Sequence, residues 1–192
     1  MRKRDMIRGY IRNVLTRVAE QTAKNDLFEQ KGERVQQEPV FVESTSNDSP
    51  QEAVIHLASS AQIEEKMLQY RVINHWATWC EGCVTELPLL QQLEEKIGAQ
   101  AMLGISWDLF QGGTPQEVCM EIQSMCAEFA IHYPQMVVTD RPDQFFQHFD
   151  ISTQLIPQTF VFSKTFALLF HKVGELDTQD IEKIQQVLSV EQ

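Results

Sequence analysis

The stretch of sequence that decides the fold is VINHWATWCEGCVTELP, residues 72–88. An apolar run leads into two cysteines with two residues between them. Apolar residues then recur at helical spacing, at Leu87, Leu90, Leu93 and Ile97. We therefore expect a strand over residues 71–77 that enters the cysteine pair and a helix over residues 83–97 that follows it.

Two cysteines at this spacing have a defined chemistry when they stand at the start of a helix. Backbone N–H groups and the helix dipole there favour the thiolate of the first cysteine, so Cys80 is the predicted nucleophile. Cys80 would attack a substrate disulfide to form a mixed disulfide. Cys83, one turn along and less accessible, would then attack that bond and release the reduced substrate. The spacing thus predicts a redox-active dithiol.

A zinc site is the alternative for such a pair, because Cys-x-x-Cys also supplies two metal ligands. A structural zinc site would need two further ligands. The other cysteines, Cys119 and Cys126, have six residues between them and lie on the apolar stripe of a predicted helix. Cysteines in such places usually behave as small buried apolar residues. The sequence therefore favours redox chemistry with no metal and no cofactor, while a regulatory role of these two cysteines stays open.

The flanking sequence alternates between short apolar runs and amphipathic segments. Strands are expected over residues 54–57, 101–107, 136–139, 159–162 and 167–170, and helices over residues 62–69, 115–131 and from Asp177 or Thr178 onward. Alternating strands and helices that end in a strand pair and a helix indicate an α/β sandwich of three layers. The chain is long enough for one such core.

Residues 1–52 differ in composition from the rest of the chain. Residues 1–24 are predicted to form a basic amphipathic helix, residues 25–52 a flexible linker, and residues 53–192 the folded domain. The formal net charge is -11, and residues 1–17 carry six basic side chains against Asp5, so the remainder carries -16. An acidic domain argues against nucleic acid as a partner. The basic segment, residues 1–18, could contact an anionic membrane, a partner or an import receptor, or stay a solvated arm.

The cellular compartment is predicted from the lack of any long, uninterrupted apolar segment in the sequence. Arginines break the N-terminal segment every few positions, so it does not match a secretory signal, and no run approaches the ~20 apolar residues of a membrane span. We therefore expect a cytoplasmic protein. Peripheral membrane attachment or organellar import through the basic N-terminal helix is the alternative.

The stretch from Val72 to Pro88 resembles the active-site region of thioredoxin-like thiol-disulfide oxidoreductases of the TlpA and ResA type. The strand, both tryptophans, both cysteines, Glu86 and the helix proline take part in the likeness. It extends to QLIPQTF, residues 154–160, which is similar to the cis-proline segment of that family, and to Val173-Gly174. It covers roughly residues 53–190. The resemblance implies a thioredoxin-like α/β/α sandwich around a central mixed sheet, and a protein disulfide reductase.

The same resemblance implies roles for individual residues. Pro157 would be cis and face the cysteines, Ile156 would offer its backbone to an extended substrate, and Trp79 would belong to the substrate-binding surface. Glu86 would be a buried acid that tunes the cysteines and exchanges protons with Cys83; the alternative is a solvated helix residue. The implied partners are protein or small-molecule disulfides and an upstream electron donor.

Three residues depart from the thioredoxin pattern. Asn74 stands where thioredoxins have an aspartate, so Glu86 or a water would have to exchange protons there. His75 replaces an aromatic residue of the strand and is interpreted as a core histidine. Glu81 follows Cys80 directly, and its negative charge should raise the pKa of the Cys80 thiol. The pair should therefore be reducing, which predicts a reductase and not an oxidase.

Three other functions are compatible with a cysteine pair in this kind of fold, and the sequence bears on each of them. A peroxiredoxin-like peroxidase would need a threonine where Ala77 stands. A copper-delivery protein would need three residues between its cysteines. A redox-inactive interaction module that docks through its N-terminal basic helix is the remaining alternative, and it predicts that Cys80 can be lost without loss of the biological role.

Overall fold

The computed structural model describes residues 52–141, 143–145 and 155–190. The predicted basic helix of residues 1–24 and the linker as far as residue 51 lie outside the described residues. Among the described residues, no helix combines the length and the apolar character needed to cross a membrane.

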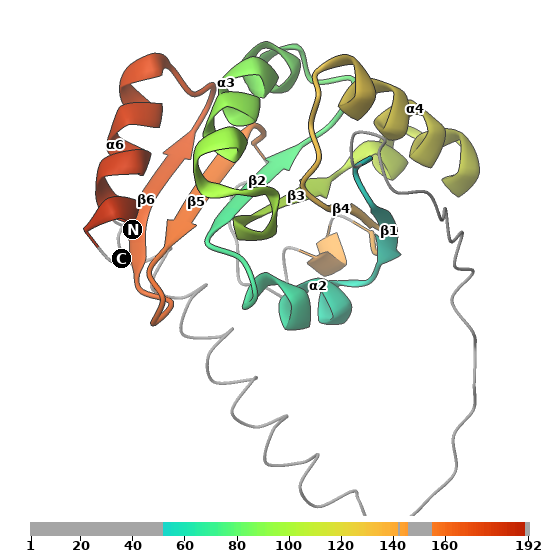
Figure 1. The fold of residues 1–192 in the computed structure, drawn as a ribbon. Helices are drawn as coiled ribbons and strands as arrows, with labels where there is room; N and C mark the ends of the chain where they lie inside the picture. The colour runs from blue at the N-terminus through green and yellow to red at the C-terminus, as the bar shows by residue number, and fades with distance from the viewer. Residues whose placement is uncertain (1–51, 142, 146–154, 191–192) are drawn as a thin grey trace, which may run out of the picture.

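Six strands form one mixed sheet at the centre of the domain (Figure 1). Its strands lie in the order β1-β4-β3-β2-β5-β6. The first four run parallel to one another, whereas β5 is antiparallel to β2 and to β6. The strand bounds are β1 Ile55–Ala58, β2 Val72–Trp76, β3 Met102–Ser106, β4 Gln135–Val138, β5 Gln158–Phe162 and β6 Leu168–Val173. The three-layer α/β sandwich with a mixed sheet is confirmed.

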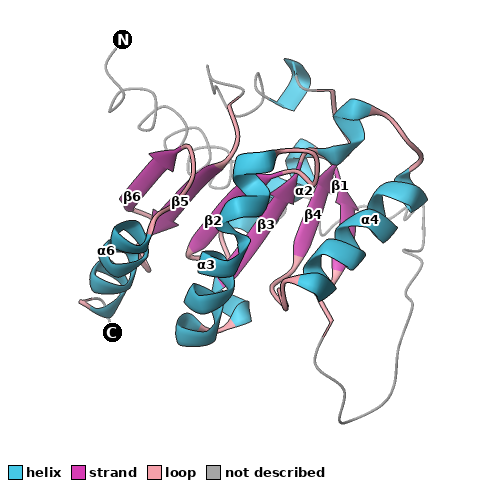
Figure 2. Cartoon of the chain, turned by 90° about the horizontal axis from the view of Figure 1, so that it is seen from above, coloured by secondary structure: helices cyan, strands magenta, loops and turns pink. Residues whose placement is uncertain are grey.

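Helices cover both faces of this sheet. The helices α3, α4 and α6 lie on one face and α2 lies on the other, as Figure 2 shows. Their bounds are α2 Ser60–Met67, α3 Glu81–Ile97, α4 Pro115–Glu128 and α6 Thr178–Ser189, and two short 3-10 helices, Ala99–Ala101 and Asp108–Gln111, flank β3. Each face therefore has its own apolar core.

The strand β2 lies between β3 and β5, and all five of its residues are buried. Val72 and Trp76 belong to the core beneath α3, whereas Ile73 belongs to the core beneath α2. Alternate side chains of a strand point to opposite faces, so the two buried polar residues, Asn74 and His75, also point to opposite faces. This register decides which of them can reach the cysteines.

The helix boundaries follow from capping groups. Cys80 caps α3, so this helix begins at Glu81, two residues before the predicted start. Thr114 and Glu117 form a reciprocal capping box at the start of α4, and of the two expected starts of the last helix, Asp177 is the residue that caps α6. The helix α4 ends at Glu128, three residues short of the prediction, because Ala130 has a positive φ of 52° and the N–H of Ile131 donates to the carbonyl of Cys126.

A buried glutamine ties the central strands together. Gln135 Oε1 accepts from Trp76 Nε1 at 2.9 Å, and Gln135 Nε2 donates to the carbonyl of Tyr133 at 3.0 Å. The glutamine side chain crosses β3 at Gly104, where an added methyl group would meet Gln135 Oε1 at 1.8 Å. Only glycine leaves room for this contact.

Replacing Gly104 by alanine is therefore expected to destabilise the domain by about 1 to 3 kcal/mol, because the added methyl group forces Gln135 off both partners. Urea unfolding followed by tryptophan fluorescence measures the change. A loss below about 0.5 kcal/mol would mean that Gln135 can move and keep its hydrogen bonds.

Candidate redox site at the start of helix α3

The loop between β2 and α3 is anchored by a buried aspartate. The backbone N–H and the hydroxyl of Thr78 both donate to Asp108 Oδ1, at 2.9 and 2.5 Å, and Ser106 Oγ donates to Asp108 Oδ2 at 2.6 Å. Asp108 follows β3, whose carboxyl end lies beside that of the parallel strand β2. The anchor holds the loop that delivers Cys80 to the edge of the sheet. Sequence analysis missed Asp108, although its place directly after a parallel strand was a usable signal.

The two cysteines lie where the sequence predicted. Their sulfur atoms are joined in a disulfide with a Cα–Cα distance of 5.2 Å, and the N–H of Cys83 donates to the Cys80 sulfur at 3.2 Å. Cys80 is partly exposed, whereas Cys83 is fully buried at 0%. Since a substrate disulfide can reach only an exposed sulfur, this difference suits Cys80 as the attacking residue and Cys83 as the resolving one.

Glu86 lies one turn beyond Cys83 on the inward side of α3. Its side chain is 1% exposed, so the solvated alternative is wrong. Glu86 Oε1 accepts from Asn74 Nδ2 at 2.8 Å, and Glu86 Oε2 accepts from the N–H of Leu176 at 2.8 Å. Burial raises the pKa of Glu86 to about 7, against the opposing effect of these two hydrogen bonds. A carboxyl group with this pKa can accept or give a proton near neutral pH.

Asn74 positions this acid and does not titrate. Its amide nitrogen donates to Thr159 Oγ1 at 3.1 Å as well as to Glu86, and it thereby links β2, β5 and α3. Glu86 is therefore the titratable carboxyl group of this buried cluster. That Glu86 takes over the proton exchange for which thioredoxins use an aspartate stays a prediction.

The predicted substrate-binding residues come from two segments, the one directly before Cys80 and the one around Pro157. The Ile156–Pro157 peptide bond is cis, as the resemblance implied. Ile156 and Cys80 are both partly exposed, and each packs against both apolar cores. Trp79 and Leu155 are the exposed apolar side chains of the two segments, with 44% and 62% of their surface accessible. Their roles in substrate binding stay predictions.

His75 faces the core beneath α2, whereas the buried Cys83 belongs to the core beneath α3. Its ring packs against Trp107, Phe145 and Phe160 in the core beneath α2, and Trp107 Nε1 donates to His75 Nδ1 at 3.3 Å. Burial lowers the pKa of His75 to about 3, so the imidazole is neutral at physiological pH. The interpretation as a core histidine is confirmed.

The other two cysteines lie on α4 and are free thiols. Cys126 is buried, and burial raises the pKa of its thiol to about 12; burial also raises the pKa of the partly exposed Cys119. Both thiols are therefore protonated near neutral pH and poor nucleophiles. Within the described part of the chain, no three His, Cys, Asp or Glu side chains are placed to hold a metal ion together.

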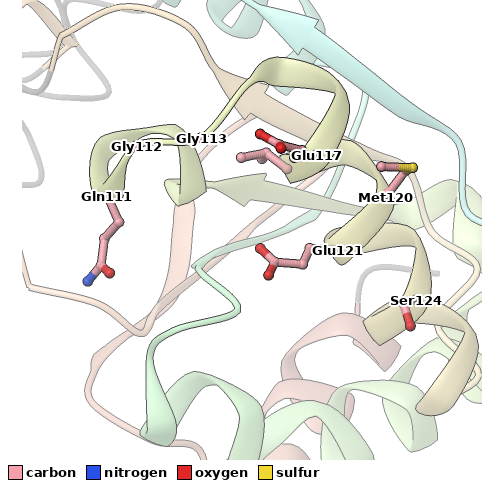
Figure 3. Close-up of a pocket in the computed structure, with 8 residues that line it drawn as sticks. Gln111, Gly112, Gly113, Glu117, Met120, Glu121 and Ser124 are labelled. Atoms are coloured by element: carbon pink, nitrogen blue, oxygen red, sulfur yellow. The ribbon is translucent and has the colours of Figure 1, made fainter.

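A surface groove of about 680 Å³ runs along α4. Figure 3 shows Glu117, Met120, Glu121 and Ser124 along the helix, with Gln111 across the groove. Its lining residues, all between Gln111 and Ser124, include none of the six predicted site residues. The groove is therefore formed without any of the residues predicted to act in the redox site.

The sequence of the chain is similar to that of curated thiol-disulfide oxidoreductases. No protein-family model matches the chain. The chain is 25% identical over 124 residues to the thiol-disulfide oxidoreductase ResA of Geobacillus kaustophilus (strain HTA426), and 24% identical over 124 residues to ResA of Geobacillus thermodenitrificans (strain NG80-2). Each match covers 62% of this chain and 66% of the relative, slightly less than two thirds of its length.

Solved structures support the fold. A DsbF homologue from Corynebacterium diphtheriae is similar with a TM-score of 0.51 and 21% identity, and the match covers 66% of this chain and 76% of that one. A thioredoxin-like protein solved in its oxidized form is similar with a TM-score of 0.50 and 21% identity, over 67% of this chain and 84% of that one. These solved structures show that the chain has a thioredoxin-like fold, and its sequence is similar to thiol-disulfide oxidoreductases of the ResA type.

Proposed function

We propose that this chain reduces protein disulfides through Cys80 and Cys83. The observation that carries the proposal is a disulfide between a partly exposed cysteine that caps α3 and a buried cysteine one turn along, with the carboxyl group of Glu86 on the next turn. The names of the ResA relatives support the same class of reaction.

The reaction begins with the reduced pair. The Cys80 thiolate attacks one sulfur of a substrate disulfide, forms a mixed disulfide with it and expels the other sulfur as a thiolate. Cys83 then loses its proton and attacks the Cys80 sulfur, which releases the second substrate thiolate and leaves the Cys80–Cys83 disulfide. An external dithiol donor must restore the reduced pair, because each turnover transfers two electrons to the substrate.

Glu86 is suited to the second step. Its carboxylate can take the proton that Cys83 must lose, and its pKa of about 7 allows the proton to be passed on afterwards. Since Asn74 cannot accept this proton, the step depends on Glu86 alone among the three polar side chains joined here, Asn74, Glu86 and Thr159.

The reduction potential tests the direction of the reaction. We expect a reversible two-electron couple at about -250 mV or below in glutathione or dithiothreitol buffers, since thioredoxin itself lies near -270 mV. Glu81→Gln should raise the potential by about 10 mV, because removal of the exposed charge stabilises the Cys80 thiolate by a few tenths of a pKa unit. A couple near -120 mV would indicate an oxidase. Absence of any reversible couple would favour the interaction module.

A further inference from the structure

Glu175 reaches the redox motif from a distant part of the sequence. It lies in the turn between β6 and α6, and its exposed side chain packs on Gly82, between the two cysteines. A methyl group added at Gly82 would come within 2.7 Å of Glu175 Oε1 and 3.0 Å of Glu175 Cγ. Because Gly82 has no side chain, the Glu175 carboxylate can occupy the space beside its Cα atom.

The charges around this carboxylate are mostly negative. Glu81 is exposed beside Cys80, and Glu175 lies close enough to Glu86 to raise the pKa of that buried acid. Lys172 lowers the pKa of Glu86, but its ammonium group already contacts the carboxylates of Asp177 and Asp180.

A second ammonium group, that of Lys183, lies 3.5 Å from Asp180. Two lysines therefore face two aspartates at the start of α6, and these four charges balance. Among the described residues, no lysine or arginine forms an ion pair with the exposed carboxylates of Glu81 and Glu175.

We propose that Glu175, together with Glu81, selects the substrate class of this site: disulfides flanked by lysine or arginine on a partner protein, with anionic disulfides such as oxidized glutathione disfavoured. This inference rests on the proposed disulfide reductase activity. Glu175 acts here as a specificity-determining residue, because its charge meets the groups that flank the scissile disulfide.

The physical basis is the Coulomb interaction across a solvent-exposed surface. Near a protein surface at low salt, one charge a few ångströms from a charge on the substrate changes the second-order rate constant by roughly three- to tenfold. Salt screens this effect. Cationic and anionic substrates respond in opposite directions. A change in the nucleophilicity of Cys80 alone would move the rates for all substrates in the same direction.

The test uses the reduced full chain and three small disulfides at low ionic strength. Cystamine carries two ammonium groups, oxidized glutathione carries a net negative charge, and 2-hydroxyethyl disulfide is neutral. Stopped-flow tryptophan fluorescence follows each second-order rate. Glu175→Gln should lower the cystamine rate about threefold, raise the glutathione rate about threefold and leave the neutral rate within twofold. Glu175→Lys should enlarge both changes, and about 0.5 M salt should remove them.

Glu128→Gln is the matched control. Glu128 is also exposed, but it ends α4 before the amino end of β4, at the edge of the sheet opposite Cys80. Its loss should therefore leave all three rates unchanged. If the three rates move together in Glu175→Gln, or if none moves, the selection by Glu175 is refuted. If wild type reacts with no disulfide, or if Cys80→Ser reacts equally well, the proposed function itself fails.

Discussion

Replacing Cys80 by serine is expected to abolish disulfide reduction, with a loss of about a thousandfold or more. The attacking group must be a thiolate, and a serine hydroxyl neither ionises near neutral pH nor forms a bond with the substrate sulfur under these conditions. Turnover of an insulin or model-peptide disulfide with dithiothreitol as donor measures the loss. Retained turnover would place the reactive sulfur elsewhere and overturn the assignment of Cys80.

Cys83→Ser gives a different expected result, which separates the two sulfurs. The first attack by Cys80 still proceeds, but the resolving step is lost, so the mixed disulfide should accumulate at one substrate per chain and be visible by mass spectrometry. Cys119→Ser is the control, because Cys119 is partly exposed on α4 and outside the pair. It should keep the wild-type rate. Accumulation of the same adduct in Cys80→Ser would reverse the assigned roles.

The second large effect is expected from Glu86→Gln. Glutamine nearly preserves the shape of the side chain but cannot take the proton from Cys83, so the rate at pH 7 should fall by about a hundredfold. The pH profile should also lose the ionisation near pH 7 that the raised pKa of Glu86 contributes to the wild-type protein.

Glu94→Gln is the matched control for this profile. Glu94 is also a buried glutamate of α3, 5% exposed with a raised pKa, but its carboxylate accepts from the N–H of His132. Glu94→Gln should change the free energy of unfolding and leave the ionisation near pH 7 in the pH–rate profile. An unchanged profile in Glu86→Gln, or an equal change in Glu94→Gln, would remove Glu86 from the proton transfer.

The same residue makes the stability of the oxidized protein depend on pH. The pKa of Glu86 is raised in the folded state, from 4.5 to about 7. Its stabilising contribution is therefore complete below about pH 4.5 and is lost as the pH rises through about 7. At 1.36 kcal/mol per pKa unit, the loss is on the order of 3 kcal/mol.

Glu86→Gln should remove this dependence, since glutamine does not ionise. The difference in unfolding free energy between the variant and wild type should shift in favour of the variant between pH 4 and pH 8. Urea titrations of both oxidized proteins across that range measure it. A constant difference would mean that the pKa of Glu86 is the same in the folded and unfolded states.

The secondary structure around the redox pair could be predicted from the local sequence. The strand that enters Cys-x-x-Cys, the helix that follows and the capping of α6 by Asp177 are short-range features, so they could be predicted from spacing and residue type. The burial of Glu86 and the cis peptide bond before Pro157 were implied only by the likeness to a family. The three-layer arrangement followed from the alternation of strands and helices.

Contacts between distant segments could not be predicted in the same way. Asp108 holds the Thr78 loop, Gln135 fills the space over Gly104, and Glu175 covers Gly82, and each pair is separated by tens of residues. The place of Asp108 directly after a parallel strand marks it as a candidate site residue, but no periodicity or motif identifies the partner in any of the three pairs. The order of the strands in the sheet decides which loop ends meet. The end of α4 at Glu128 likewise depends on the backbone of Ala130.

The sequence by itself determined the redox pair and the class of fold, because thiol spacing, helix start and hydrophobic alternation are local properties of the chain. Only the tertiary structure decided the environment of that pair. Placing β2 between β3 and β5 buries Asn74 beside Glu86, and the turn after β6 brings the N–H of Leu176 to Glu86 and the Glu175 carboxylate to Gly82. Burial and charge at a site arise from the packing of remote segments. Burial sets the pKa of Glu86, and the charge beside the cysteines sets the proposed preference for substrates.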